Sequence, residues 1–98
     1  MVKFGELINV EIPVLIDFHF EWDKIGENPH KVLRDVVAAL GDRVKIIKID
    51  IEKNVILADA LKVKALPTFI VYKGGAMQWR RSGDMDANDL IDVMQQYA

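Results

Sequence analysis

Few side chains in this sequence have the types and spacing that chemistry requires. The residues that could bind a metal ion are His19, Asp23, Glu27 and His30. Imidazole and carboxylate are common metal ligands, but this spacing matches no diagnostic ligand pattern, so we interpret them as ordinary solvated residues. The 98 residues contain no cysteine, and thiol-disulfide exchange requires a thiolate. The sequence therefore predicts a redox-inactive chain without a metal site or a cofactor.

Composition limits the class of protein further. Thirteen basic and fifteen acidic residues give a net charge of -2, and 51% of the residues are hydrophobic. This balance is typical of one globular domain over residues 1–98, with no broad attraction to nucleic acid or anionic membranes. No apolar stretch approaches the roughly 20 residues of a membrane span. No secretory signal is visible either, so we expect a cytoplasmic protein.

Hydrophobic periodicity predicts a strand, a helix and a second strand in the first half. Val14 to Phe20 is a nearly continuous apolar run, typical of a central strand buried on both faces. From Pro29 to Leu40 apolar residues recur at intervals of three and four, and Gly41 follows as a stop signal. Arg43 to Asp50 predicts a strand parallel to the first. The expected apolar face of the helix consists of Val32, Leu33, Val36, Val37 and Leu40.

The second half predicts a short helix, a β-hairpin and a terminal helix. The short helix spans residues 54–61. Thr68 to Tyr72 and Met77 to Arg81 predict antiparallel strands, because two glycines between them allow the positive φ of a tight turn. A final helix starts near Asp86. The expected N-caps are Asn54 and Asp86, and the expected buried faces are Ile56, Leu57, Ala60 and Leu61 in the short helix and Leu90, Ile91, Met94 and Tyr97 in the last.

Several local sequences resemble the thioredoxin family. They are Pro13-Val14-Leu15-Ile16-Asp17-Phe18, Glu21-Trp22, Ala65-Leu66-Pro67-Thr68-Phe69, Lys73-Gly74-Gly75 and Gly83. The resemblance implies a thioredoxin fold, a three-layer α/β/α arrangement with a mixed sheet of about four strands. In this fold a parallel βαβ unit precedes a helix, an antiparallel hairpin and a C-terminal helix. Asp23-Lys24-Ile25-Gly26 stands where the family has Cys-Gly-Pro-Cys, so both catalytic sulfurs are replaced.

The start of the first long helix has two interpretations. In the resembling enzymes the first cysteine lies at the amino end of this helix, where backbone N–H groups stabilise its thiolate. Asp23 in that place would use the same N–H groups as an N-cap. Alternatively, Asn28 caps the helix and Pro29 takes its first position, which avoids a proline in the helix interior. We favour the later start or a kink at Pro29.

Asp17 and Lys48 resemble the buried acid of thioredoxins and the lysine beside it. In the family the acid assists proton movement near the second cysteine, and without thiols that role has no substrate. We therefore interpret Asp17 as a structural acid held by Lys48 or water, because an unpaired buried carboxylate is costly. Use of Asp17 and His19 in an unrelated reaction is the rival enzyme hypothesis.

Pro67 resembles the family's cis-proline, where the preceding backbone N–H and C=O are free to pair with an extended peptide. We therefore predict a redox-inactive module that binds a protein or an extended peptide. The candidate binding residues are Trp22, Asp23, Lys24, Ile25, Gly26, Leu66 and Pro67. The alternatives are a thioredoxin-type disulfide oxidoreductase by descent, and a chaperone or subunit of a larger assembly. We expect a monomer, with no nucleic acid and no membrane as partner.

Overall fold

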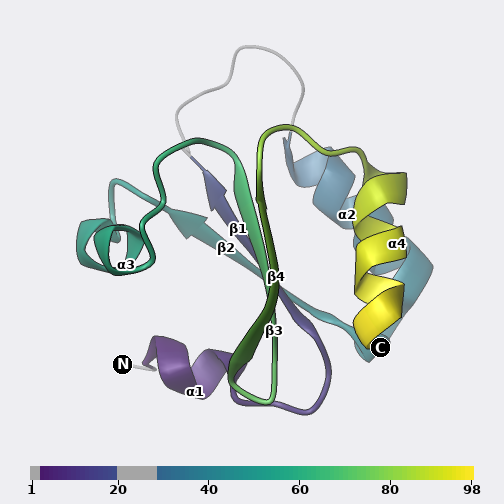
Figure 1. Ribbon diagram of the computed structural model, residues 1–98. Helices are drawn as coiled ribbons and strands as arrows, with labels where there is room; N and C mark the ends of the chain where they lie inside the picture. The colour runs from purple at the N-terminus through teal and green to yellow at the C-terminus, as the bar shows by residue number, and fades with distance from the viewer. Residues whose placement is uncertain (1–2, 20–28) are drawn as a thin grey trace.

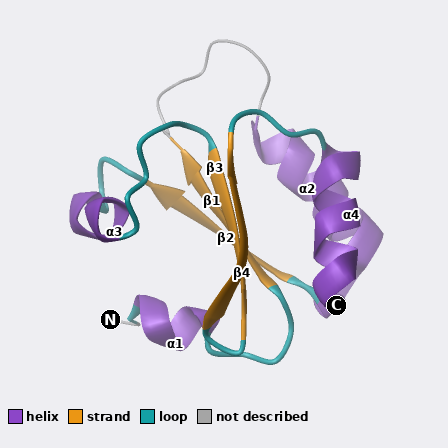
Figure 2. Cartoon of the chain, in the orientation of Figure 1, coloured by secondary structure: helices purple, strands orange, loops and turns teal. Residues whose placement is uncertain are grey.

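The computed structural model describes residues 3–19 and 29–98 (Figure 1). The elements in chain order are α1 (Phe4–Ile8), β1 (Val14–His19), α2 (Pro29–Leu40), the 3₁₀ turn η1 (Gly41–Arg43), β2 (Lys45–Asp50), α3 (Val55–Ala60), β3 (Thr68–Lys73), β4 (Ala76–Ser82) and α4 (Ala87–Tyr97). The strands form one mixed sheet in the order β2-β1-β3-β4 (Figure 2). Figure 1 shows α1 and α3 on one face of this sheet and α2 and α4 on the other. The fold therefore has the predicted three layers and four main strands.

β1 is the central strand that its apolar run predicts. It pairs in parallel with β2 and antiparallel with β3, and its first five residues are buried. Because side chains of a strand alternate between the faces of a sheet, β1 contributes to two separate cores. Leu15 packs with Leu33 and Leu90 beneath α2 and α4, whereas Ile16 and Phe18 pack beneath α1 and α3.

β2 is shorter at its start than the sequence predicts. Arg43, which we expected to open the strand, belongs to η1. Its guanidinium donates hydrogen bonds to the carbonyls of Leu40 and Ala39, at 3.2 and 3.3 Å, and these carbonyls lie at the C-terminal end of α2. A helix leaves its last carbonyls without intrahelical partners, so Arg43 serves the end of α2 and the strand begins at Lys45.

The buried face of α3 was predicted correctly only in part. Ile56 is 87% exposed and Ala60 is also exposed, whereas Ala58 is buried. Leu57 and Leu61 pack against the core beneath α1 and α3. Residues 57, 58 and 61 share one side of a helix, and position 56 lies outside it. Asn54 occupies the N-cap position without a side-chain capping bond; its amide donates to the Asp50 carbonyl instead.

The two helices on the opposite face follow the sequence closely. α2 buries Leu33, Val36 and Leu40, although Val37 is 48% exposed, so its apolar face is narrower than predicted. In α4, Leu90 and Met94 are fully buried. Its N-cap is Asp86, as predicted; the carboxylate accepts a hydrogen bond from the Asp89 amide at 2.8 Å. No helix within the described ranges is long and apolar enough to cross a membrane.

The hairpin turn anchors the N-terminal helix to the sheet. Gly74 and Gly75 both have positive φ, which explains the glycine pair between the strands. Their amides donate to the carbonyls of Val10 and Ile8, at 2.8 and 3.1 Å. The end of the hairpin opposite to the Leu66–Pro67 bend is therefore fully engaged with the chain's own backbone.

Candidate functional site

The candidate site is centred on the bend at Leu66 and Pro67, where the chain enters β3. The peptide bond between these residues is cis. The last pair between β1 and β3 joins Phe18 to Thr68. The C-terminal end of β1 and the Leu66–Pro67 bend therefore lie at the same end of the two paired strands. The fold thus brings the C-terminal end of β1 close to the cis-proline.

Hydrogen bonds from the buried Thr68 hold this bend in place. The Thr68 hydroxyl lies 2.5 Å from the Ala65 carbonyl, to which it donates, and 2.9 Å from the Ser82 hydroxyl. Since Thr68 has one hydroxyl proton, donation to Ala65 makes Ser82 the donor in the second bond. The Gly83 amide also donates to the Pro67 carbonyl at 2.9 Å. The bend is therefore fixed on both sides by β3 and by the end of β4.

Leu66 is the residue in the bend whose backbone groups stay available. Within the part of the chain that the structure describes, neither its amide nor its carbonyl takes part in a hydrogen bond. Its side chain is half-buried and packs against the core beneath α1 and α3. A rigid bend thus presents one donor and one acceptor that an added extended chain can use.

Asp17 pairs with Phe69, two residues after Pro67, and lies inside the protein. Its side chain is 2% exposed, and its Oδ1 accepts no hydrogen bond from any described residue. Burial raises the pKa of Asp17 to about 6, while the charges of His19 and Lys48 lower it by less. The structure therefore contains a carboxyl group that titrates well above the ordinary range of an aspartate.

Lys48 supports Asp17 through charge. The two residues are register neighbours in the parallel pair of β1 and β2. Lys48 is exposed, however, and its contribution to the Asp17 pKa is the smallest of the three causes. The sequence predicts that Lys48 or water holds the Asp17 carboxyl, and the structure shows an electrostatic effect of Lys48 on the Asp17 pKa.

Several predicted site residues lie outside the described residues. They are Trp22, Asp23, Lys24, Ile25 and Gly26, together with Glu27 and the second capping candidate Asn28. The described part of α2 begins at Pro29, and Asp17, Lys48, Leu66 and Pro67 are all described. The side chain of His30 is also outside the described part, and among the side chains that the structure does describe no group of three or more metal-ligating residues comes together.

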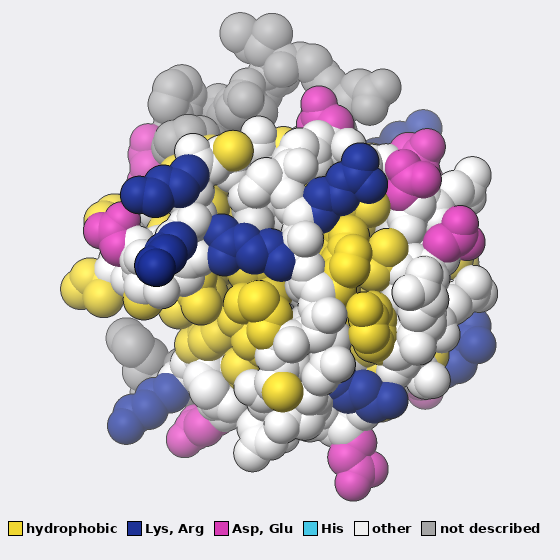
Figure 3. Space-filling model, in the orientation of Figure 1, with side chains coloured by type: hydrophobic (Ala, Val, Ile, Leu, Met, Phe, Trp, Pro, Cys, Tyr) yellow, Lys and Arg dark blue, Asp and Glu magenta, His cyan; other side chains and the backbone are white. Residues whose placement is uncertain are grey.

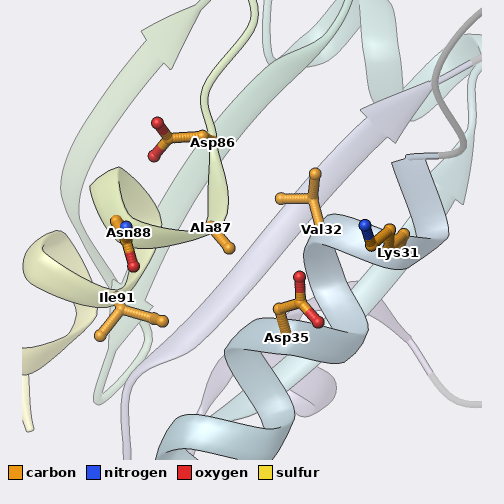
Figure 4. Close-up of a pocket in the computed structure, with 7 residues that line it drawn as sticks. All are labelled: Lys31, Val32, Asp35, Asp86, Ala87, Asn88 and Ile91. Atoms are coloured by element: carbon orange, nitrogen blue, oxygen red, sulfur yellow. The ribbon is translucent and has the colours of Figure 1, made fainter.

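A hollow between α2 and α4 was not anticipated from the sequence (Figure 4). Its lining comes from the first part of α2 and from the start of α4: Lys31, Val32, Asp35, Asp86, Ala87, Asn88 and Ile91. Val32, Ala87 and Ile91 lie on the inner side of the hollow, between the two helices. The Asp86 carboxylate already caps α4, which leaves Lys31 and Asp35 as the charged side chains of α2 at its rim.

Comparison with known proteins places the chain in a family. The thioredoxin family model matches residues 2–96. Thioredoxin-2 of the malaria parasite superposes with a TM-score of 0.80 at 27% identity, over 87% of this chain and 82% of that one. A mutant thioredoxin from Halobacterium salinarum gives a TM-score of 0.74 at 29% identity, over 97% and 85% of the two chains. The chain belongs to the thioredoxin family and has the thioredoxin fold.

Curated relatives point to the same family. The chain is 38% identical over 94 residues to the chloroplastic thioredoxin Y of Oryza sativa, covering 95% of this chain and 56% of the rice protein. It is 37% identical over 91 residues to the chloroplastic thioredoxin Y2 of Arabidopsis thaliana, covering 92% and 54%. The chain therefore spans about half the length of these relatives. Unlike the dithiol enzymes of the family, it contains no cysteine.

Proposed function

We propose that this thioredoxin-family chain is a redox-inactive module that binds a protein or an extended peptide at the Leu66–Pro67 bend. The observation that carries the proposal is that no described residue hydrogen-bonds the backbone of Leu66, on a bend held by Thr68 and Gly83. An extended chain that lies along Leu66 satisfies its amide and its carbonyl at once, as in the addition of a strand.

The missing thiols support binding without turnover. A thioredoxin-type reaction requires a thiolate to attack the substrate disulfide and a second thiol to release the mixed disulfide. The chain supplies neither group, and Asp17, which resembles the acid that serves those thiols, has no sulfur to serve. Binding at the bend needs only backbone groups, so it does not depend on the lost cysteines.

Amide-resolved NMR tests the binding step. Titration of the labelled protein with extended peptides is expected to shift the Leu66 amide resonance and slow its hydrogen exchange. The amides of Gly74 and Gly75 are the internal control, because both already donate to carbonyls at the other end of the hairpin. Peptide binding that leaves Leu66 unchanged would refute this mode of recognition.

A turnover assay tests the absence of redox activity. Purified protein in the presence of dithiothreitol is expected to reduce insulin disulfides at the rate of dithiothreitol alone. A cysteine-containing thioredoxin serves as the positive control. Reductase activity that co-purifies with this chain and is lost when the chain is removed would favour the oxidoreductase alternative.

A further inference from the structure

Basic residues are concentrated around the Leu66–Pro67 bend. Residues 61–82 contain five lysines and arginines and no aspartate or glutamate, whereas the whole chain has thirteen basic and fifteen acidic residues. Because the net charge of the chain is -2, this segment carries +5 and all other residues together carry -7. The net charge thus conceals a strong separation of charge.

The fold places four of these cations along the β4 edge of the sheet and in the adjoining α3–β3 connection. Arg80 and Arg81 are successive strand residues, so their side chains point to opposite faces of the sheet. Lys62 and Lys64 lie in the connection from α3 to the bend. Arg80 and Arg81 lie in β4, where they pair with Ile70 and Phe69, which belong to the cores on opposite faces of the sheet. All four are exposed, and we call them the basic surface. Figure 3 shows dark blue side chains gathered across the face that presents β4 and the α3–β3 connection.

Arg80 fastens the connection that bears Lys62 and Lys64 to β4. The Arg80 guanidinium donates to the carbonyls of Leu61 and Lys62, the latter at 2.8 Å. These bonds tie the connection that bears Lys62 and Lys64 to the end of β4. The relative position of the two backbone segments that carry these residues is therefore set by the fold.

No carboxylate of the described residues neutralises the positive charges of the basic surface. The acceptors of Arg80 are backbone carbonyls, and no carboxylate among the described residues forms an ion pair with any of the four cations. Asp59 and Asp84 border the segment in sequence without pairing with them. At physiological ionic strength such a cluster acts on anionic groups within about 8 Å.

We propose that the partner bound at the Leu66–Pro67 bend is an acidic extended segment of a protein, whose aspartates and glutamates contact the basic surface. This inference rests on the proposed function. Backbone pairing at Leu66 does not discriminate between sequences, so specificity must come from side chains nearby. Lys64 lies two residues before Leu66, and Arg81 pairs with Phe69, two residues after Pro67. Acidic residues a few positions from the paired residue therefore meet positive charge.

Selection from a random-peptide library tests this inference without a known partner. Peptides retained by the protein are expected to be enriched in aspartate and glutamate over the unselected library. Enrichment without acidic residues would overturn the acidic preference and leave peptide binding intact. Failure to retain any peptide would overturn the proposed function and, with it, this inference.

Matched charge-reversal variants locate the contact. The double variant Lys64→Glu with Arg81→Glu is expected to bind a selected acidic peptide about tenfold more weakly, measured by fluorescence anisotropy. The control double variant Lys31→Glu with Arg34→Glu makes the same change in net charge on exposed residues of α2 and is expected to bind within about twofold of the parent. Arg80 is left intact because it supports the fold. Equal losses in both variants would refute the assigned surface.

Two further measurements separate the partner classes. A version of the selected peptide with Gln and Asn in place of Glu and Asp is expected to bind the parent protein about tenfold more weakly than the acidic peptide does. This neutral peptide should bind the parent and the Lys64→Glu, Arg81→Glu variant equally. Raising the salt concentration should weaken the binding of the acidic peptide and leave the binding of the neutral peptide unchanged. Single-stranded oligonucleotide bound as tightly as the acidic peptide would overturn the proposal in favour of a nucleic-acid site.

Discussion

The hydroxyl of Thr68 lies 2.9 Å from the hydroxyl of Ser82, and this contact joins the start of β3 to the end of β4. Thr68 is completely buried and also bonds the Ala65 carbonyl one residue before Leu66. The shape of the candidate site thus depends on one buried side chain that would not itself touch a bound peptide. Its replacement should therefore affect stability and binding together.

Thr68→Val keeps the branched shape of the side chain but removes its hydroxyl. We expect a loss of about 1–3 kcal/mol in the free energy of unfolding, because the Ala65 carbonyl loses its donor beside a buried apolar group. Urea denaturation followed by circular dichroism measures this loss. Ser82→Ala, which removes the exposed partner, should cost less. A Thr68→Val protein as stable as the parent would show that the hydroxyl does not hold the bend.

Asp17 is expected to make stability depend on pH. The pKa of Asp17 is about 6 in the folded protein and 3.8 in the unfolded reference, so the folded state holds a proton that the unfolded state releases between these values. Stability therefore falls as the pH rises from about 4 to 6 and levels off above, by about 3 kcal/mol in total. Chemical denaturation across this range measures the change.

Asp17→Asn should remove that part of the pH dependence, because an amide does not titrate. Asp35→Asn provides the control, since Asp35 is an exposed carboxyl group and its replacement should leave the profile unchanged. His19→Gln measures how much the neighbouring imidazole contributes to the pH dependence of stability. An undiminished fall in stability in the Asp17→Asn protein would assign the titration to another group.

Arg80 connects β4 to the end of α3 through the carbonyls of Leu61 and Lys62. Arg80→Ala is expected to lower the free energy of unfolding by about 1–2 kcal/mol, because these charge-assisted bonds are lost. Arg81→Ala is the matched control, as no described group binds its side chain, and it should change stability by less than about 0.5 kcal/mol. Equal effects of both replacements in thermal denaturation would contradict this role of Arg80.

The sequence was sufficient for most of the element boundaries and for the family. The apolar run of β1 and the three-and-four spacing in α2 are local patterns, so they predicted these elements directly. Asp86 and the glycine pair at positions 74 and 75 act on their immediate neighbours, and both behaved as predicted. The error in α3, which misplaced Ile56 and Ala60 on its buried face, has a different origin. In a helix of six residues the periodic signal is too short to show which side meets the sheet.

The amino-acid sequence by itself determined that no cysteine is available, that the chain carries thioredoxin-family segments and that a strand, helix and hairpin order follows. Only the tertiary structure decided which distant residues meet. It set Arg80 against the carbonyl of Lys62, and it buried the Asp17 carboxyl so that its pKa rises. The physical reason is range: periodicity and capping act over a few residues of one segment. Desolvation of a buried group and hydrogen bonds between distant residues depend on every element packed around a site. A local sequence pattern does not contain that information.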